Sequence, residues 1–202
     1  MAPTRLEAPV VLLVEGKTAE IFFEALRDHL GLTREIQVQN FGGVNQLRPF
    51  LRALTAMNGF PDVVRAVVCV RDAEADALAA FRSVRDSLRA AGLDGPAAAG
   101  RLTEGRPRTG VFVLPDGVAP GMLETLCLTS VTADPAMACV DAFMACLETA
   151  NVRVRNTAKA RAQTFLASRG GDQVGRAAQQ GHWPLDSPPF EPLRRFLNEA
   201  IR

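Results

Sequence analysis

The chain has 202 residues, 48% of them apolar, and its 23 Lys and Arg residues nearly balance 22 Asp and Glu residues, which gives a net charge of +1. This length and apolar content fit one domain, or one domain with an elaborated tail, and exclude wholesale disorder. The charge balance argues against a surface covered in positive charge for non-specific nucleic-acid binding, while a local basic patch remains compatible with it.

The first half of the sequence alternates short β-branched apolar runs with amphipathic segments. A continuous apolar run suits a strand buried on both faces, and apolar residues three and four apart suit a helix. The predicted order is strand 9–15, helix 18–30, strand 36–41, helix 47–54, strand 63–70, helix 76–91 and strand 110–114. This alternation predicts an α/β fold of Rossmann-like type, with a mostly parallel four-stranded sheet and helices on both faces.

The second half has a different character. A loop rich in Gly, Pro and Arg covers residues 92–109, and after the fourth strand the patterns are helical, over 135–150, 155–168 and 191–201. No further strong strand follows. We therefore expect an α/β core over residues 1–130 and a helical C-terminal extension over 131–202 that packs on the core.

Acidic residues follow two of the predicted buried strands. Glu15 comes directly after the first strand, and Asp72, Glu74 and Asp76 come after the third. Because ligands on a parallel sheet sit at the carboxyl ends of the strands, folding should gather these carboxylates at one edge. Such a cluster repels itself unless a cation or a proton joins it, and hard divalent cations prefer oxygen ligands. The pattern predicts a site for Mg²⁺ (or Mn²⁺), with acids of a helix first turn as the alternative interpretation of residues 72–76.

The three residues after Glu15, Gly16-Lys17-Thr18, match the end of the phosphate-binding P-loop motif. That motif needs a glycine five positions before the Gly-Lys pair, where this chain has Val11 inside the strand. Lys17 can still neutralise a phosphate near a helix N-terminus. The alternative is a solvated turn with Thr18 as the helix N-cap.

Taken together, Leu13-Val14-Glu15-Gly16, Gly42-Gly43 and the segment 70–76 resemble a Toprim domain. That fold is shared by topoisomerases, bacterial primases, recombination-repair proteins and the overcoming-lysogenization-defect nucleases. The resemblance covers residues 8–115 and implies that Glu15 acts as general acid/base or metal ligand, and that Asp72 and Glu74 hold Mg²⁺. The chain departs from the family pattern at Glu74, where Asp is usual, and Asp76 can compensate.

Two later segments, 120–126 and 181–186, resemble a narrower group of small bacterial proteins with a stand-alone Toprim-like domain and no assigned activity. Glu124 lies in the first of them, about ten residues after the fourth strand. It either reaches the same edge of the sheet as a further metal ligand, as similar glutamates do in the overcoming-lysogenization-defect nucleases, or serves as a first-turn acid on a helix. Both interpretations remain open at this point.

Residues 151–180 carry six basic side chains against Asp172 alone. Arg155 and Lys159 are four residues apart and share a helix face, close to Arg161. This face can meet a phosphate backbone, and Lys159 can stabilise charge that develops on a phosphate. A solvated basic helix is the alternative.

The leading functional hypothesis is a Mg²⁺-dependent phosphoryl-transfer enzyme, specifically a nuclease that acts on DNA or RNA. A regulatory module that binds nucleic acid or protein without catalysis is the competing hypothesis, and hydrolysis of a small phosphate ester is the third. Topoisomerase activity is disfavoured because the chain contains no Tyr to serve as nucleophile. Primase activity is disfavoured because 202 residues leave no room for the usual additional modules.

The cysteines and the apolar segments suggest a location in the cell. Cys69, Cys127, Cys139 and Cys146 form no C-x-x-C pair and lie in apolar runs, so we expect four buried thiols in a reducing cytoplasm. No apolar run reaches about 18 residues, and we expect no membrane insertion. The sequence does not predict an oligomeric state.

Overall fold

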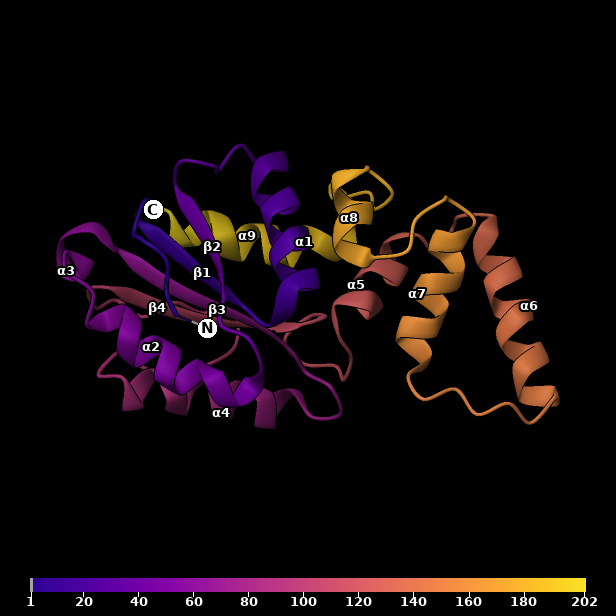
Figure 1. The fold of residues 1–202 in the computed structure, drawn as a ribbon, viewed down its shortest axis with the longest axis horizontal. Helices are drawn as coiled ribbons and strands as arrows, with labels where there is room; N and C mark the ends of the chain where they lie inside the picture. Colours follow the sequence, from indigo (N-terminus) through magenta and orange to yellow (C-terminus); the bar gives the residue numbers. More distant parts are fainter. Residues whose placement is uncertain (1) are drawn as a thin grey trace.

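A computed structural model describes residues 2–202 and confirms the predicted fold class. Four parallel strands form one sheet in the order β2-β1-β3-β4, with helices on both of its faces (Figure 1). The strands are β1 (Val10–Val14), β2 (Ile36–Asn40), β3 (Ala66–Asp72) and β4 (Arg108–Leu114).

The two central strands owe their position to their apolar sequence. All five residues of β1 are buried, and so are the first five of β3, because both faces of the sheet are covered. Successive side chains point to opposite faces, so Val10, Leu12 and Val14 enter one core while Val11 and Leu13 enter the other. A strand of this kind needs an apolar residue at every position rather than alternation.

Each face of the sheet has its own helical layer. One face is covered by α2 (Leu47–Thr55), α3 (Phe60–Val63) and α4 (Ala77–Ala90), after a short 3₁₀ turn, η1 (Val44–Gln46). The other face packs against α1 (Gly16–His29) and α9 (Glu191–Ala200), with α5 (Leu123–Ser130) and α8 (Val174–Gln179) beside them. On this face Phe112 of β4 lies against Phe196 of α9, with ring centroids 5.5 Å apart.

Residues beyond 130 form two different kinds of structure. Helices α6 (Ala136–Thr149) and α7 (Thr157–Ala167) pack on each other and project from one end of the molecule (Figure 1). The chain then returns to the sheet through α8 and, after the 3₁₀ turn η2 (Pro188–Phe190), through α9. The approach of α8 to α1 is close, since a Cβ on Gly175 would lie 2.5 Å from the carbonyl oxygen of Thr18. The domain boundary at residue 130 stays a prediction.

Some local expectations were wrong. Cys69 and Cys127 are buried as expected, but Cys139 and Cys146 are exposed, because α6 buries only Met137 and Val140. Helix α1 begins at Gly16 with Glu15 as its N-cap residue, so Thr18 is inside the helix and is not its cap. Among residues 2–202, no helix combines the length and the apolar character that a membrane crossing would need.

Candidate functional site

The carboxyl ends of β1 and β3 form the point at which the strand order reverses. From β1 the chain crosses to β2 on one side, whereas from β3 it crosses to β4 on the other. Glu15 follows the last residue of β1, and Asp72 is the last residue of β3. The crevice outside two such strand ends is the usual ligand site of an open parallel sheet.

A cavity of about 120 Å³ opens at this point. Five charged residues from four separate parts of the fold line it: Glu15 from the end of β1, Arg71 and Asp72 from β3, Glu124 from α5 and Lys159 from α7. The guanidinium of Arg71 donates a hydrogen bond to Ser83 of α4. Apolar side chains form its floor and walls, among them Phe23 of α1, Val70 of β3 and Leu114 of β4. Residues separated by more than 140 positions in the sequence therefore face one small space.

Asp72 is the most perturbed acid of the cavity. Its Oδ1 accepts a hydrogen bond of 2.9 Å from the backbone N–H of Leu123, at the N-terminus of α5. Within residues 2–202 the Asp72 side chain has no other hydrogen bond and no ion pair. Burial raises the pKa of Asp72 to about 7, because the Leu123 hydrogen bond only partly offsets the desolvation and because Glu124, Glu74 and Glu15 add repulsion. A cation bound beside Asp72 would offset the desolvation and repulsion that disfavour its ionised form.

Glu124 and Lys159 reach the cavity through helix N-termini. Glu124 lies in the first turn of α5 and also lines the cavity. Its position is therefore compatible both with a metal ligand and with an acid that favours the start of a helix. Lys159 is the third residue of α7, and its backbone N–H donates to the Asn156 side chain that caps this helix. In the described part of the chain neither side chain is engaged in an ion pair, so both remain available to a ligand.

The other acids that follow β3 do not join the cavity. Glu74 has a left-handed backbone, with φ of 53°, and its N–H and carbonyl both bond to Gly121 at 2.8 Å. Asp76 caps α4 by accepting a 2.9 Å hydrogen bond from the backbone N–H of Ala79. The segment after β3 turns at Glu74 and the helix begins at Ala77, so Glu74 and Asp76 do not line the cavity that Asp72 lines. Metal ligation by Glu74 and Asp76 remains a prediction that this arrangement does not favour.

The basic residues that the sequence singled out also differ in whether they line the cavity. Lys17 forms an ion pair of 3.0 Å with Glu20, which raises the pKa of Lys17, and it does not line the cavity. Arg161 forms an ion pair of 2.5 Å with Asp141 of α6. Arg155 is exposed in the segment that leads into α7. Lys159 is thus the basic candidate that the fold brings to the acids.

The donor chemistry fits a hard divalent cation held by few protein ligands. Among residues 2–202, no three Asp, Glu, His or Cys side chains stand close enough together to enclose a metal ion. Mg²⁺ commonly takes only one or two carboxylates and completes its shell with waters and substrate phosphates. Asp72, with Glu15 or Glu124 beside it, supplies such a set.

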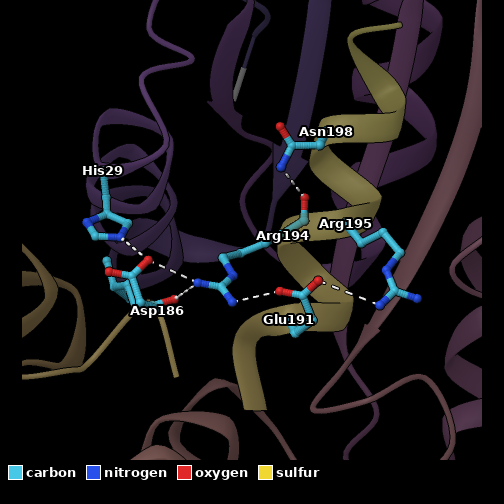
Figure 2. Close-up of polar contacts among 7 residues, drawn as sticks. His29, Asp186, Glu191, Arg194, Arg195 and Asn198 are labelled. Carbon is cyan, nitrogen blue, oxygen red and sulfur yellow. Dashed lines mark hydrogen bonds and ion pairs between the residues drawn. The ribbon is translucent and has the colours of Figure 1, made fainter. Parts of the chain in front are cut away.

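The two histidines lie elsewhere. His29, at the C-terminus of α1, forms a 3.0 Å contact with Asp186, and Arg194 joins Asp186 to Glu191 (Figure 2). This network ties α1 to the first turn of α9 on the surface, and its side chains are mostly exposed. Neither His29 nor His182 lines the acidic cavity.

Sequence reasoning missed the residue that holds the turn after Glu15. Asn40 ends β2, and its Oδ1 accepts hydrogen bonds from the backbone N–H groups of Gly16 and Gly42. A signal was present, because Asn40 is a polar residue at the carboxyl end of a third strand, next to Gly42-Gly43. The strand pattern alone does not show that its side chain turns toward Glu15.

Comparisons with known proteins place the fold in context. The family described as "Protein of unknown function (DUF3226)" matches residues 9–202, whereas no curated protein matches the chain. Two similar solved structures are of the C-terminal region of the Xanthomonas campestris pv. campestris OLD protein, phased with mercury and with platinum. Both have a TM-score of 0.50, at 17% and 16% identity; each alignment covers 96% of this chain, and 96% and 94% of the other chain. At these identities the likeness shows a shared fold.

Proposed function

The chain belongs to DUF3226, a family of proteins of unknown function, and we propose that it is a Mg²⁺-dependent phosphoryl-transfer enzyme of Toprim type that cleaves DNA or RNA. One observation carries the proposal: three carboxylates and one ammonium group, from Glu15, Asp72, Glu124 and Lys159, line one cavity at the switch point of a parallel sheet. The fold shared with the OLD-protein structures supports this proposal, because it agrees with the fold that the resemblance of residues 8–115 to a Toprim domain implied.

Each residue of the cavity has a role that its surroundings favour. Asp72, with Glu15 or Glu124, would hold the cation, because Asp72 is an acid that gains most from a neighbouring positive charge. A bound Mg²⁺ supplies Lewis-acid polarisation of the phosphodiester and promotes deprotonation of a water. Glu15 is exposed at the mouth of the cavity, where its carboxylate can accept a proton from an attacking water. Lys159 would donate to a phosphate oxygen and offset the charge that develops there.

The size of the cavity favours a polymer backbone over a free nucleotide. Pockets that enclose small molecules hold roughly 300 to 1,000 Å³, whereas this one holds about 120 Å³. That space admits a phosphate group with a few waters and leaves a sugar and base outside. Base stacking is also disfavoured, because the single Trp, Trp183, is buried and its indole N–H donates to Val174. We therefore propose cleavage that depends on the backbone and little on base sequence.

A non-catalytic regulatory module is the second candidate. The observation that favours it is the absence, within residues 2–202, of three metal-ligating side chains close enough to share an ion. On this view the buried acid holds one weakly bound ion or a proton, and a partner protein supplies the chemistry.

Thermal melting with Mg²⁺ or Mn²⁺ and a cleavage assay separate the two candidates. Metal that binds only the folded state must raise Tm by linkage. We expect a rise for the wild type, together with cleavage of plasmid and single-stranded substrates, and loss of cleavage for Glu15→Gln and Asp72→Asn. Glu35→Gln is the matched control, because it neutralises an exposed acid at the start of β2, at the opposite edge of the sheet. Cleavage that persists in both cavity variants refutes the enzyme proposal, and a Tm unchanged up to millimolar metal refutes the cation site.

A further inference from the structure

Asn40 is a buried polar side chain with an unusual concentration of backbone contacts. It is 9% exposed, and its single Oδ1 accepts from Gly16 N at 3.0 Å and from Gly42 N at 2.8 Å. Asn40 pairs in register with Val14, the residue before Glu15, so its side chain starts beside the end of β1. One amide oxygen thereby fastens the turn that follows β1 to the turn that follows β2.

The turn after Glu15 depends on this oxygen because no local cap replaces it. Glu15 is the N-cap residue of α1, but its side chain makes no capping hydrogen bond. Gly16 has a φ of 81°, a left-handed conformation that favours glycine, and it directs its N–H at Asn40. The Glu15 carboxylate is consequently free for the cavity while the turn that carries it is held from the neighbouring strand.

The amide nitrogen of Asn40 continues the connection into α1. Its Nδ2 lies 3.4 Å from Glu20 Oε2, and the same oxygen of Glu20 forms the 3.0 Å ion pair with Lys17. The start of α1 is therefore linked to the end of β2 at two points: the N–H of Gly16 and the carboxylate of Glu20.

We propose that Asn40 is a positioning residue for Glu15, which it acts on through the backbone of Gly16. This inference rests on the proposed function, in which Glu15 serves a bound cation and the attacking water. Outer-shell partners of metal ligands commonly change metal affinity or activity about 10- to 100-fold when they are removed. Because Asn40 acts through the backbone rather than on the carboxylate itself, we expect the lower end of that range.

The test compares Asn40→Ala with Asn40→Asp and Gln39→Ala. Asp keeps an oxygen that can accept from both glycines, although its second oxygen meets the Glu20 carboxylate, whereas Ala removes both. Gln39 is the matched control: it is a buried amide one residue away, whose Oε1 accepts from the backbone N–H of Thr4 and not from the turn after Glu15.

Mn²⁺ binding to the purified full chain, followed by electron paramagnetic resonance, is the first measurement. We expect Asn40→Ala to weaken Mn²⁺ affinity about tenfold, Asn40→Asp to keep more of the affinity than Asn40→Ala, and Gln39→Ala to bind unchanged even where its Tm falls. In cleavage, Asn40→Ala should lower kcat with little change in KM. An Asn40→Ala variant with wild-type Mn²⁺ affinity and kcat overturns the proposal.

Amide hydrogen exchange without metal is the second measurement, and it distinguishes this inference from the proposed function. Asn40→Ala should lose protection at Gly16 and Gly42 ahead of the rest of the sheet, and Gln39→Ala should not. A wild type that binds no Mn²⁺ refutes the proposed function, while exchange still reports whether Asn40 holds the Glu15 turn. Unchanged protection at Gly16 in Asn40→Ala overturns the positioning role even if the wild type binds metal and cleaves.

Discussion

Replacement of Asp72 by Asn tests the central feature of the cavity without any ligand. Burial holds the pKa of Asp72 at about 7, against an ordinary value of 3.8, so the ionised side chain costs the folded state free energy. Asn keeps an oxygen that can accept from Leu123 N–H, but it carries no charge. Asp72→Asn should therefore stabilise the metal-free protein where the wild-type carboxyl is ionised.

The magnitude follows from the two pKa values. Because the pKa of Asp72 is raised in the folded state, its contribution to the free energy of unfolding is fully present below pH 3.8. That contribution is lost as pH rises toward about 7. One pKa unit corresponds to 1.36 kcal/mol, so the free energy of unfolding of the wild type should fall, relative to that of Asp72→Asn, by roughly 2 to 3 kcal/mol between pH 5 and pH 8. For a chain of this size, that difference amounts to roughly 5 to 10 °C in Tm.

The assay is thermal or urea unfolding of both proteins in a chelating buffer across that pH range. Other titrating groups change both proteins alike, so the difference between them isolates Asp72. The gap in stability should widen with pH in favour of Asp72→Asn, and Mg²⁺ at pH 8 should then raise the Tm of the wild type only. A stability difference that stays constant from pH 5 to pH 8, or one that widens in favour of the wild type, would refute the conclusion that burial raises the pKa of Asp72.

Four further substitutions separate the residues that the sequence grouped together. Asp76→Ala removes the cap of α4, so urea unfolding should show a loss of about 1 kcal/mol, while Mn²⁺ affinity stays at the wild-type value. Glu124→Gln removes a source of repulsion, so the pKa of Asp72, read from the pH dependence of stability, should fall below about 7, and Mn²⁺ binding should weaken. Lys159→Met should abolish most cleavage but keep Mn²⁺ binding, since its ammonium group would meet phosphate; loss of both would contradict that role. Arg155→Met should reduce the salt dependence of nucleic-acid binding by about one ion, as measured by titration at several salt concentrations.

The sequence predicted the sheet edge well because that edge depends on local patterns. Continuous apolar runs identify β1 and β3 as central strands, and the register of parallel strands then places Glu15 and Asp72 at one edge. The same logic failed two residues later. Glu74 adopts a left-handed backbone through its pairing with Gly121, a contact between segments 47 positions apart that no local pattern encodes.

The rest of the cavity depends on contacts between distant segments. Glu124 reaches the acids because Asp72 accepts from the N-terminus of α5, and Lys159 reaches them because α7 packs against α5. A sequence pattern identifies the helices that carry these residues, but it does not state which turn of which helix faces the sheet. The basic face drawn from the sequence is divided for the same reason: Lys159 turns to the cavity, whereas Arg161, half a turn further along α7, is paired with Asp141 of α6.

The cavity residues differ in whether the sheet or a helix holds them. Asp72 lies on a strand and Glu15 directly follows one, so the hydrogen bonds of the sheet and of Asn40 hold the backbone at these two positions. Glu124 and Lys159 lie on helices: α5 reaches the sheet edge through the hydrogen bond from Leu123 to Asp72, and α7 packs against α5, α6 and α8. If α6 and α7 shift when a polymer binds, Lys159 moves with them while Glu15 and Asp72 stay. Binding of a cation should therefore precede and not require substrate, whereas placement of Lys159 should depend on it; hydrogen exchange in α7 that slows with Mn²⁺ alone would contradict this order.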